Sequence, residues 1–243
     1  MIGRPAPSAG LFDSGTMAPG DGHEDDLDGL LRRVDPDRWL SSRFVADPER
    51  RQDVVALYAF DHELARAPVV ASNSLLGEIR LTWWREALQE IFEGRPVRAH
   101  PAAQALAQAV GRRKLPRDLL QAMVEARYRE LDPAPMSETE ALDWACGTGG
   151  GAARLAVQVL DPETNAALAE PGGAAWALGR RLGRDEGLRP AFDRLLGAAR
   201  SAARGLSVAA FPAVAHAALA GRPEASELRK RLRVTLAVAR GRI

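Results

Sequence analysis

The sequence contains a single cysteine, Cys146, among its 243 residues. One thiol cannot form an internal disulfide, and a chain without disulfides fits a reducing compartment. Histidine is scarce too, and the spacing of its four positions matches no metal-binding motif: His23, His62, His100 and His216. These two scarcities argue against a disulfide-stapled fold and against a structural zinc site.

Long apolar runs and a strong net charge are also missing. No stretch is apolar over the roughly 20 residues that a membrane-spanning helix needs, and the start of the chain lacks the apolar core of a secretory signal. Lysine occurs only at Lys114 and Lys230, yet the arginines are balanced by acids and the formal net charge is +1. Without a broad basic field, we expect no nucleic-acid partner.

Segments that alternate apolar and polar residues are absent as well, so nothing predicts a β-strand. A start rich in Gly, Pro, Ser and Asp predicts a disordered tail over residues 1–25. Apolar residues then recur with helical spacing through residues 26–243, without a linker long enough to separate domains. We predict one all-α domain of about ten helices, one of them over residues 208–221.

One predicted helix, over residues 47–67, places a carboxylate on its buried side. Asp61 falls on the same apolar stripe as Leu57. An unpaired buried charge is very costly, so Asp61 needs a partner. One hypothesis is a salt bridge to Arg80 or Arg85 on the next helix. The other is a polar cavity between helices that holds a diphosphate and magnesium.

Aromatic side chains gather on the same two helices. Tyr58, Phe60, Trp83 and Trp84 could line a channel for a hydrocarbon, or they could pack as ordinary core. The spacing alone leaves both interpretations open.

A glycine-rich run, Gly147 to Gly151, follows a helix start in which Ser137 and Glu140 form a capping box. Each glycine costs a helix about 1 kcal/mol relative to alanine, so the run predicts a kink or a close approach of two backbones. It lacks the preceding strand and the lysine of a phosphate-binding loop, so it is not a nucleotide site.

The stretch from Leu57 to Phe92, with "LYAFDHELA" followed by "WWREAL", resembles the squalene/phytoene synthase family. The similarity covers roughly residues 38–180 and is strongest from Val54 to Gly94. It implies an isoprenoid-synthase fold, in which the helices surround a central cavity and two isoprenoid diphosphates are joined head to head. In that family, aspartates after a Tyr-Ala-Phe motif hold magnesium, and small residues such as those at 147–151 form one wall of the cavity.

The first motif departs from the family pattern. Its Tyr-Ala-Phe is present at residues 58–60, but the family's phosphate-contacting arginine corresponds to His62. The positions of the metal-binding aspartates carry no carboxylate: Ala65, Arg66 and Val69. The resemblance therefore implies a fold without the first set of metal ligands.

The second acidic motif, expected near residues 173–189, departs in the same way. Ala177 and Arg180 replace its Gln and Asn, Asp185 lies one place out of register, and Arg189 stands where a later acid belongs. An Arg-x-Tyr-Leu-Pro element is missing, and the C-terminal part is shorter than is usual in the family.

This pattern is similar to a non-catalytic branch of the family, the assembly factors of respiratory complex I. That resemblance implies no catalytic residue and no metal or other cofactor. It implies a protein in the cytoplasm, able to lie against the inner membrane, that binds a respiratory-complex subunit, a lipid or an isoprenoid. We expect the former prenyl cavity to be lined by five residues: Tyr58, Asp61, Arg80, Trp84 and Arg85.

Two other hypotheses come from different classes. The chain could be an active prenyltransferase of the phytoene or squalene synthase type, with magnesium in an altered site around Asp61, Glu63 and Glu78. It could also be a helical scaffold whose interior is filled and keeps no cavity.

Overall fold

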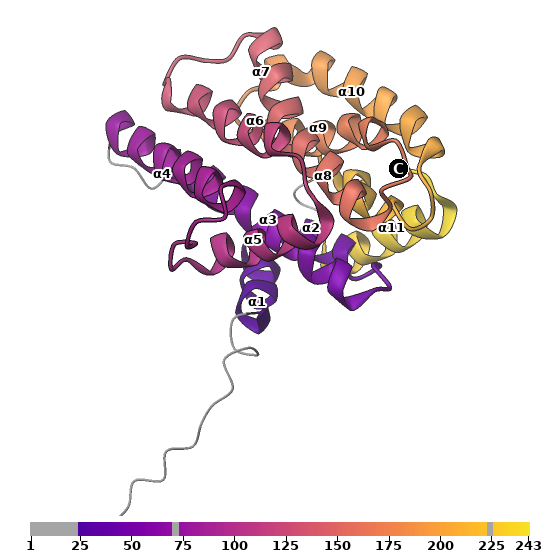
Figure 1. The fold of residues 1–243 in the computed structure, drawn as a ribbon. Helices are drawn as coiled ribbons and strands as arrows, with labels where there is room; N and C mark the ends of the chain where they lie inside the picture. The colour runs from indigo at the N-terminus through magenta and orange to yellow at the C-terminus, as the bar shows by residue number, and fades with distance from the viewer. Residues whose placement is uncertain (1–23, 70–72, 223–225) are drawn as a thin grey trace, which may run out of the picture.

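The computed structural model describes residues 24–69, 73–222 and 226–243 (Figure 1). These residues contain α-helices, short 3₁₀ turns and one π-helical turn, and no strand, which confirms the predicted all-α fold. The prediction of a disordered tail over residues 1–25 falls almost wholly outside the described residues. None of the described helices is both long enough and apolar enough to cross a membrane.

The described residues form eleven α-helices, close to the predicted ten. Their bounds are α1 Glu24–Val34, α2 Pro36–Ser42, α3 Pro48–Val69, α4 Ser74–Phe92, α5 Pro101–Arg113, α6 Arg117–Tyr128, α7 Glu138–Ala145, α8 Gly151–Leu160, α9 Glu170–Gly179, α10 Arg189–Ala202 and α11 Glu227–Arg240. The capping box predicted for Ser137 and Glu140 opens α7.

Helix α3 runs through the middle of the bundle (Figure 1). It packs against α1, α2, α4, α5, α6 and α8. Every residue from Asp53 to Asp61 is buried, so this part of the helix has no face towards water. Any charge on it must find its counter-charge inside the protein.

At the glycine-rich run two helical segments lie backbone against backbone. Residues Cys146–Gly150 form a π-helical turn between α7 and α8. A Cβ on Gly149 would collide with the carbonyl of Gly173 in α9, and a Cβ on Gly173 would collide with Gly149 in return. The glycines therefore permit the contact of backbones that the sequence predicted.

The prediction of a helix over residues 208–221 is wrong. This segment, mostly buried from residue 210 onward, contains only two short 3₁₀ helices, Phe211–Ala213 and Ala215–Leu219. Pro212 has no N–H to donate to a helical ladder. Its carbonyl instead accepts a hydrogen bond of 2.6 Å from the Ser41 hydroxyl of α2. The two turns pack against α2, α8, α9 and α11.

Candidate functional site

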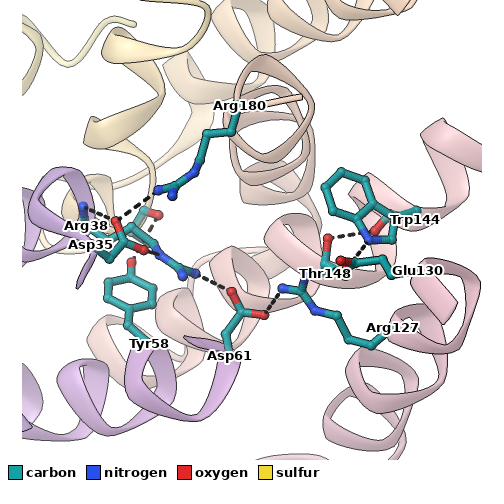
Figure 2. Close-up of polar contacts among 10 residues, drawn as sticks. Asp35, Arg38, Tyr58, Asp61, Arg127, Glu130, Trp144, Thr148 and Arg180 are labelled. Carbon is teal, nitrogen blue, oxygen red and sulfur yellow. Dashed lines mark hydrogen bonds and ion pairs between the residues drawn. The ribbon is translucent and has the colours of Figure 1, made fainter. Parts of the chain in front are cut away.

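Asp61 lies between two arginines in the centre of the bundle (Figure 2). Its Oδ2 accepts a hydrogen bond of 2.7 Å from Nη1 of Arg38 on α2, and its Oδ1 accepts one of 2.7 Å from Nη2 of Arg127 on α6. All three side chains are buried. The carboxylate therefore joins three helices through two charge-assisted hydrogen bonds.

The pairing predicted from the sequence is wrong, because neither Arg80 nor Arg85 binds Asp61. Both expected partners lie on α4. The actual partners come from α2, which precedes α3 in the chain, and from α6, which is the second helix after α4. Arg85 is exposed and lies 3.9 Å from Glu125 instead.

The charges continue outward from Asp61 on both sides. Arg38 also donates from Nε to Asp35, at 2.5 Å, and Asp35 caps the start of α2 by accepting from the Arg38 backbone N–H. On the other side, Nη1 of Arg127 donates to Glu130 at 2.7 Å, and the indole N–H of Trp144 donates to the same carboxylate. We call Asp35, Arg38, Asp61, Arg127 and Glu130 the buried charge network.

Aromatic rings surround the guanidinium of Arg38. Its carbon Cζ lies 4.8 Å from the centre of the Tyr58 ring and 4.5 Å from that of Trp176. His216 packs edge-on against both of those rings. The cation is thus held by ring faces as well as by carboxylates, which suits a guanidinium removed from water.

These surroundings shift the pKa values of Asp61, Arg38 and Arg127 in the direction that keeps each side chain charged. Burial alone would raise the pKa of Asp61, but Arg127 and Arg38 outweigh it and hold that pKa well below its usual range. Burial likewise opposes the charge on Arg38, but Asp35 and Asp61 raise its pKa above the ordinary value. Burial raises the pKa of Tyr58, so its hydroxyl stays protonated.

A cavity of about 230 Å³ borders the network. Thr148 and Gly149, from the glycine-rich run, form part of its wall, as the family resemblance implied. Arg180, Arg181 and Arg184, which follow α9, line it too. Five arginines therefore face three carboxylates around this space, and its presence argues against the hypothesis of a scaffold with a filled interior.

The five residues expected to line one pocket fall in different places. Asp61 lines the central cavity, and Tyr58 lies beside it against Arg38. Arg80 and Trp84 line a separate cavity of about 380 Å³ between α3 and α4. Arg85 lines neither cavity. Whether any of them binds a ligand stays a prediction.

Trp84 also answers the question about the aromatic side chains. It is buried and packs edge-on against Phe60 and Trp83, at 5.3 and 4.9 Å between ring centres. Phe60 belongs to the core, whereas Trp83 and Trp84 reach the wall of the α3–α4 cavity. Tyr58 stands apart from them and belongs to the central site.

Sequence reasoning missed most of the network. Arg38, Arg127 and Glu130 were not expected at the site, nor were Trp144 and Trp176. One signal was available for Arg127. It continues the apolar stripe of α6 through Leu120, Met123 and Val124, so its burial could have been anticipated as that of Asp61 was.

Comparisons with known proteins agree with this architecture. The family described as squalene/phytoene synthase matches residues 31–189. Among solved structures, a dehydrosqualene synthase in complex with ligand has a TM-score of 0.68 at 14% identity, covering 90% of this chain and 96% of that one. A squalene synthase from Alicyclobacillus acidocaldarius has a TM-score of 0.64 at 15% identity, covering 90% and 94%. Both likenesses confirm the isoprenoid-synthase fold.

Curated relatives of another kind match part of the chain. The human protein "NADH dehydrogenase (ubiquinone) complex I, assembly factor 6" is 30% identical over 132 residues, which is 54% of this chain and 39% of that one. The Bos taurus protein of the same name is 28% identical over the same lengths. The match thus spans about two fifths of each relative.

Residues from both of the motifs that differ from the family pattern line the central cavity. His62, Ala65 and Val69 line it from α3, and Ala177 and Arg180 line it from α9 and its end. Asp185, the displaced acid of the second motif, accepts a hydrogen bond from the Gly187 backbone N–H in a turn. The side chains that meet across this space are mostly cationic or apolar.

The magnesium that this fold family implies does not fit these residues. Asp35, Asp61 and Glu130 line the cavity, but each is bonded to an arginine. Across the described ranges, no group of three or more His, Cys, Asp or Glu side chains could hold a metal ion. The altered site suggested around Asp61 does not form either, since Glu63 pairs with Arg66 and Glu78 lies exposed on α4.

Proposed function

Because the chain belongs to the squalene/phytoene synthase family, we propose that it is a binding protein of the complex I assembly-factor type that has lost prenyl transfer. The partial match to assembly factor 6 supports the type of function. The arrangement of charges in the central cavity supports the loss of catalysis.

The observation that carries the proposal is the position of Asp61 between Arg38 and Arg127. When an allylic diphosphate ionises, negative charge builds up on the leaving group, and metal ions held by carboxylates stabilise it. Here both carboxylate oxygens of Asp61 already accept hydrogen bonds from guanidinium groups. Releasing them for a metal would take from two buried cations the carboxylate that they share and leave Arg38 with Asp35 alone and Arg127 with Glu130 alone, which is unfavourable.

The cavity keeps a different capability. Guanidinium groups bind phosphate directly and in a fixed geometry, without a metal between them. Arg180, Arg181 and Arg184 border the space where the family's second motif would supply acids. A phosphorylated isoprenoid or lipid could bind there, in line with the ligand class that the family resemblance implies.

A turnover assay tests the loss of catalysis. Purified protein is incubated with farnesyl or geranylgeranyl diphosphate and magnesium, beside a known squalene or phytoene synthase as positive control. We expect no head-to-head product and no released pyrophosphate above background. Product formation that depends on the protein would overturn the proposal and favour the active prenyltransferase.

Calorimetry separates the two hypotheses further. Farnesyl diphosphate is titrated into the protein in magnesium and, separately, in chelator. The proposal predicts equal heats in the two buffers, because the arginines need no metal. The prenyltransferase alternative predicts binding only with magnesium, abolished by Asp61→Ala.

The assembly role is tested in the host organism. Deletion of the gene should lower NADH:ubiquinone oxidoreductase activity of isolated membranes several-fold, and succinate oxidation by the same membranes serves as control. Restoring the gene should restore the first activity. Equal NADH oxidation with and without the gene would contradict the role. Fractionation of cells should find the protein in the cytoplasm and against the inner membrane.

A further inference from the structure

Helix α11 docks on the bundle through one narrow face. Val234 and Ala237 are buried there. Lys230, on the same side, forms an ion pair of 3.3 Å with Asp37 of α2. The helix also packs against the 3₁₀ turn Ala215–Leu219. These contacts hold that face of α11 against the bundle.

The opposite face of α11 is apolar although it points to water. Leu228, Leu232 and Leu236 are 78%, 57% and 38% exposed. Spaced four residues apart, they form one stripe along the helix. Leu232 and the buried Val234 are two positions apart, which places them about 200° apart around the axis. The leucine stripe therefore faces directly away from the bundle.

Cations border this stripe. Arg229, Arg231, Arg233 and Arg240 on α11, and Arg242 just after it, are all exposed. The acidic residue of the same segment, Glu227, stands at the first turn, 3.7 Å from Lys230. An exposed apolar stripe flanked by arginines is the pattern of a helix that lies in the interface of a bilayer, with leucines among the acyl chains and guanidinium groups at the phosphates.

We propose that the leucine stripe of α11, with its flanking arginines, seats the protein on a membrane surface that contains anionic lipids. The positive charge of these arginines favours an anionic lipid surface, and not a second copy of the chain, as the binding partner of the stripe. In a symmetric dimer built on the stripe, the same arginines would face one another without acids between them. An anionic lipid surface supplies the missing negative charge along the whole stripe. This proposal rests on the membrane location expected under the proposed function and names the surface responsible for it, whereas the turnover and NADH-oxidation assays test the proposed function without this surface.

The test is flotation of the purified full chain with vesicles of two compositions, phosphatidylcholine alone and phosphatidylcholine with phosphatidylglycerol. We expect flotation with the anionic vesicles, weakened by added salt. The combined variant Leu228→Gln, Leu232→Gln and Leu236→Gln should bind roughly tenfold or more weakly. Replacing Arg229, Arg231 and Arg233 by Gln should remove the preference for phosphatidylglycerol.

A matched control is available on α4, where Leu75, Leu76 and Ile79 are also exposed. Their replacement by Gln should leave flotation unchanged, and thermal melts should show that all variants fold. Absence of flotation, or equal loss in the α4 variant, would overturn the proposal. So would a wild-type dimer in light scattering that the α11 leucine variant converts to monomer, since the stripe would then bind a second copy.

Discussion

Asp53 and Asp61 lie two turns apart on α3. Each is paired with two arginines, but the surroundings of the two pairs differ. Asp53 is held by Arg112 and Arg113 of α5, at 2.5 and 2.6 Å. Asp61 is held by Arg38 and Arg127, both at 2.7 Å. The arginines of Asp53 remain 34% and 17% exposed, whereas those of Asp61 are buried.

The two clusters differ in how far water can reach their arginines. Arg112 and Arg113 sit at the end of α5, where water can reach part of each guanidinium. Arg38 and Arg127 have no such outlet, and further carboxylates and rings surround them. The Asp53 cluster fastens two helices near the surface. The Asp61 cluster lines the central cavity, so of the two clusters it alone bears on the proposed loss of the metal site.

Among the variants that test this comparison, Asp61→Ala should lose the most stability. It leaves Arg38 and Arg127 buried without the carboxylate between them, and we expect a loss of about 3–5 kcal/mol in the free energy of unfolding. Urea denaturation of the variant and the wild type measures it. Asp61→Asn, which keeps the shape and removes the charge, should also be destabilised. A loss in the free energy of unfolding smaller than that of Asp53→Ala would show that the buried charge network contributes little to stability.

Asp53→Ala should cost less, about 1–3 kcal/mol, because the freed arginines can regain water. The same urea titration gives the value. An effect equal to that of Asp61→Ala would erase the distinction between the two clusters and imply that exposure of the arginines does not matter.

Acid should weaken the interior around Arg38 through His216. Burial, and to a lesser extent Arg38, lowers the pKa of His216 well below 6.5, so the folded protein holds it neutral. The unfolded chain binds a proton near pH 6.5 and the folded one does not. Stability is therefore fully present above that pH and falls below it, by up to about 1.4 kcal/mol per pH unit.

The measurement is the free energy of unfolding between pH 7.5 and 5, with His216→Phe as comparison. The variant should show a shallower fall over that range, because it has no imidazole to protonate. Parallel curves would mean that His216 is charged in the folded protein. The Asp53 cluster, which has no histidine among its ion-pair partners, should not alter the slope when it is mutated.

Arg85→Ala should have the smallest effect, below about 0.5 kcal/mol. Its contact with Glu125 spans 3.9 Å between two side chains that are largely exposed. The variant sharpens the comparison by adding a pair in which both side chains are more than half exposed. A loss close to that of Asp53→Ala would show that surface charges on α4 matter more than their exposure indicates.

Much of the fold could be predicted from the sequence. Helical spacing, the capping box at Ser137 and the glycine-rich run each depend on neighbouring residues, and each was predicted correctly. The exception was the segment over residues 208–221, where apolar composition favoured a helix but the structure has 3₁₀ turns around Pro212, which has no N–H for a helical ladder. Local spacing does not record which carbonyls the rest of the protein will satisfy.

The site was predicted less well for the same reason. The helical stripe identified Asp61 as buried, which is a property of one helix. Its partners come from α2 and α6, 23 and 66 residues away in the chain, and the nearer arginines of α4 were chosen wrongly. Asp53 was missed altogether, although it too is buried on α3. A helix pattern tells which side chains turn inward but not which other inward side chains they meet.

The sequence by itself determined that the chain is helical, that it has the Tyr-Ala-Phe motif of its family, and that the acids expected after that motif are replaced. Only the tertiary structure decided that the remaining carboxylate is bound by two arginines from distant helices, and that a stripe of leucines on α11 faces outward. Pairing of buried charges and exposure of apolar side chains depend on how helices pack in space, and packing brings together residues that sequence order keeps apart.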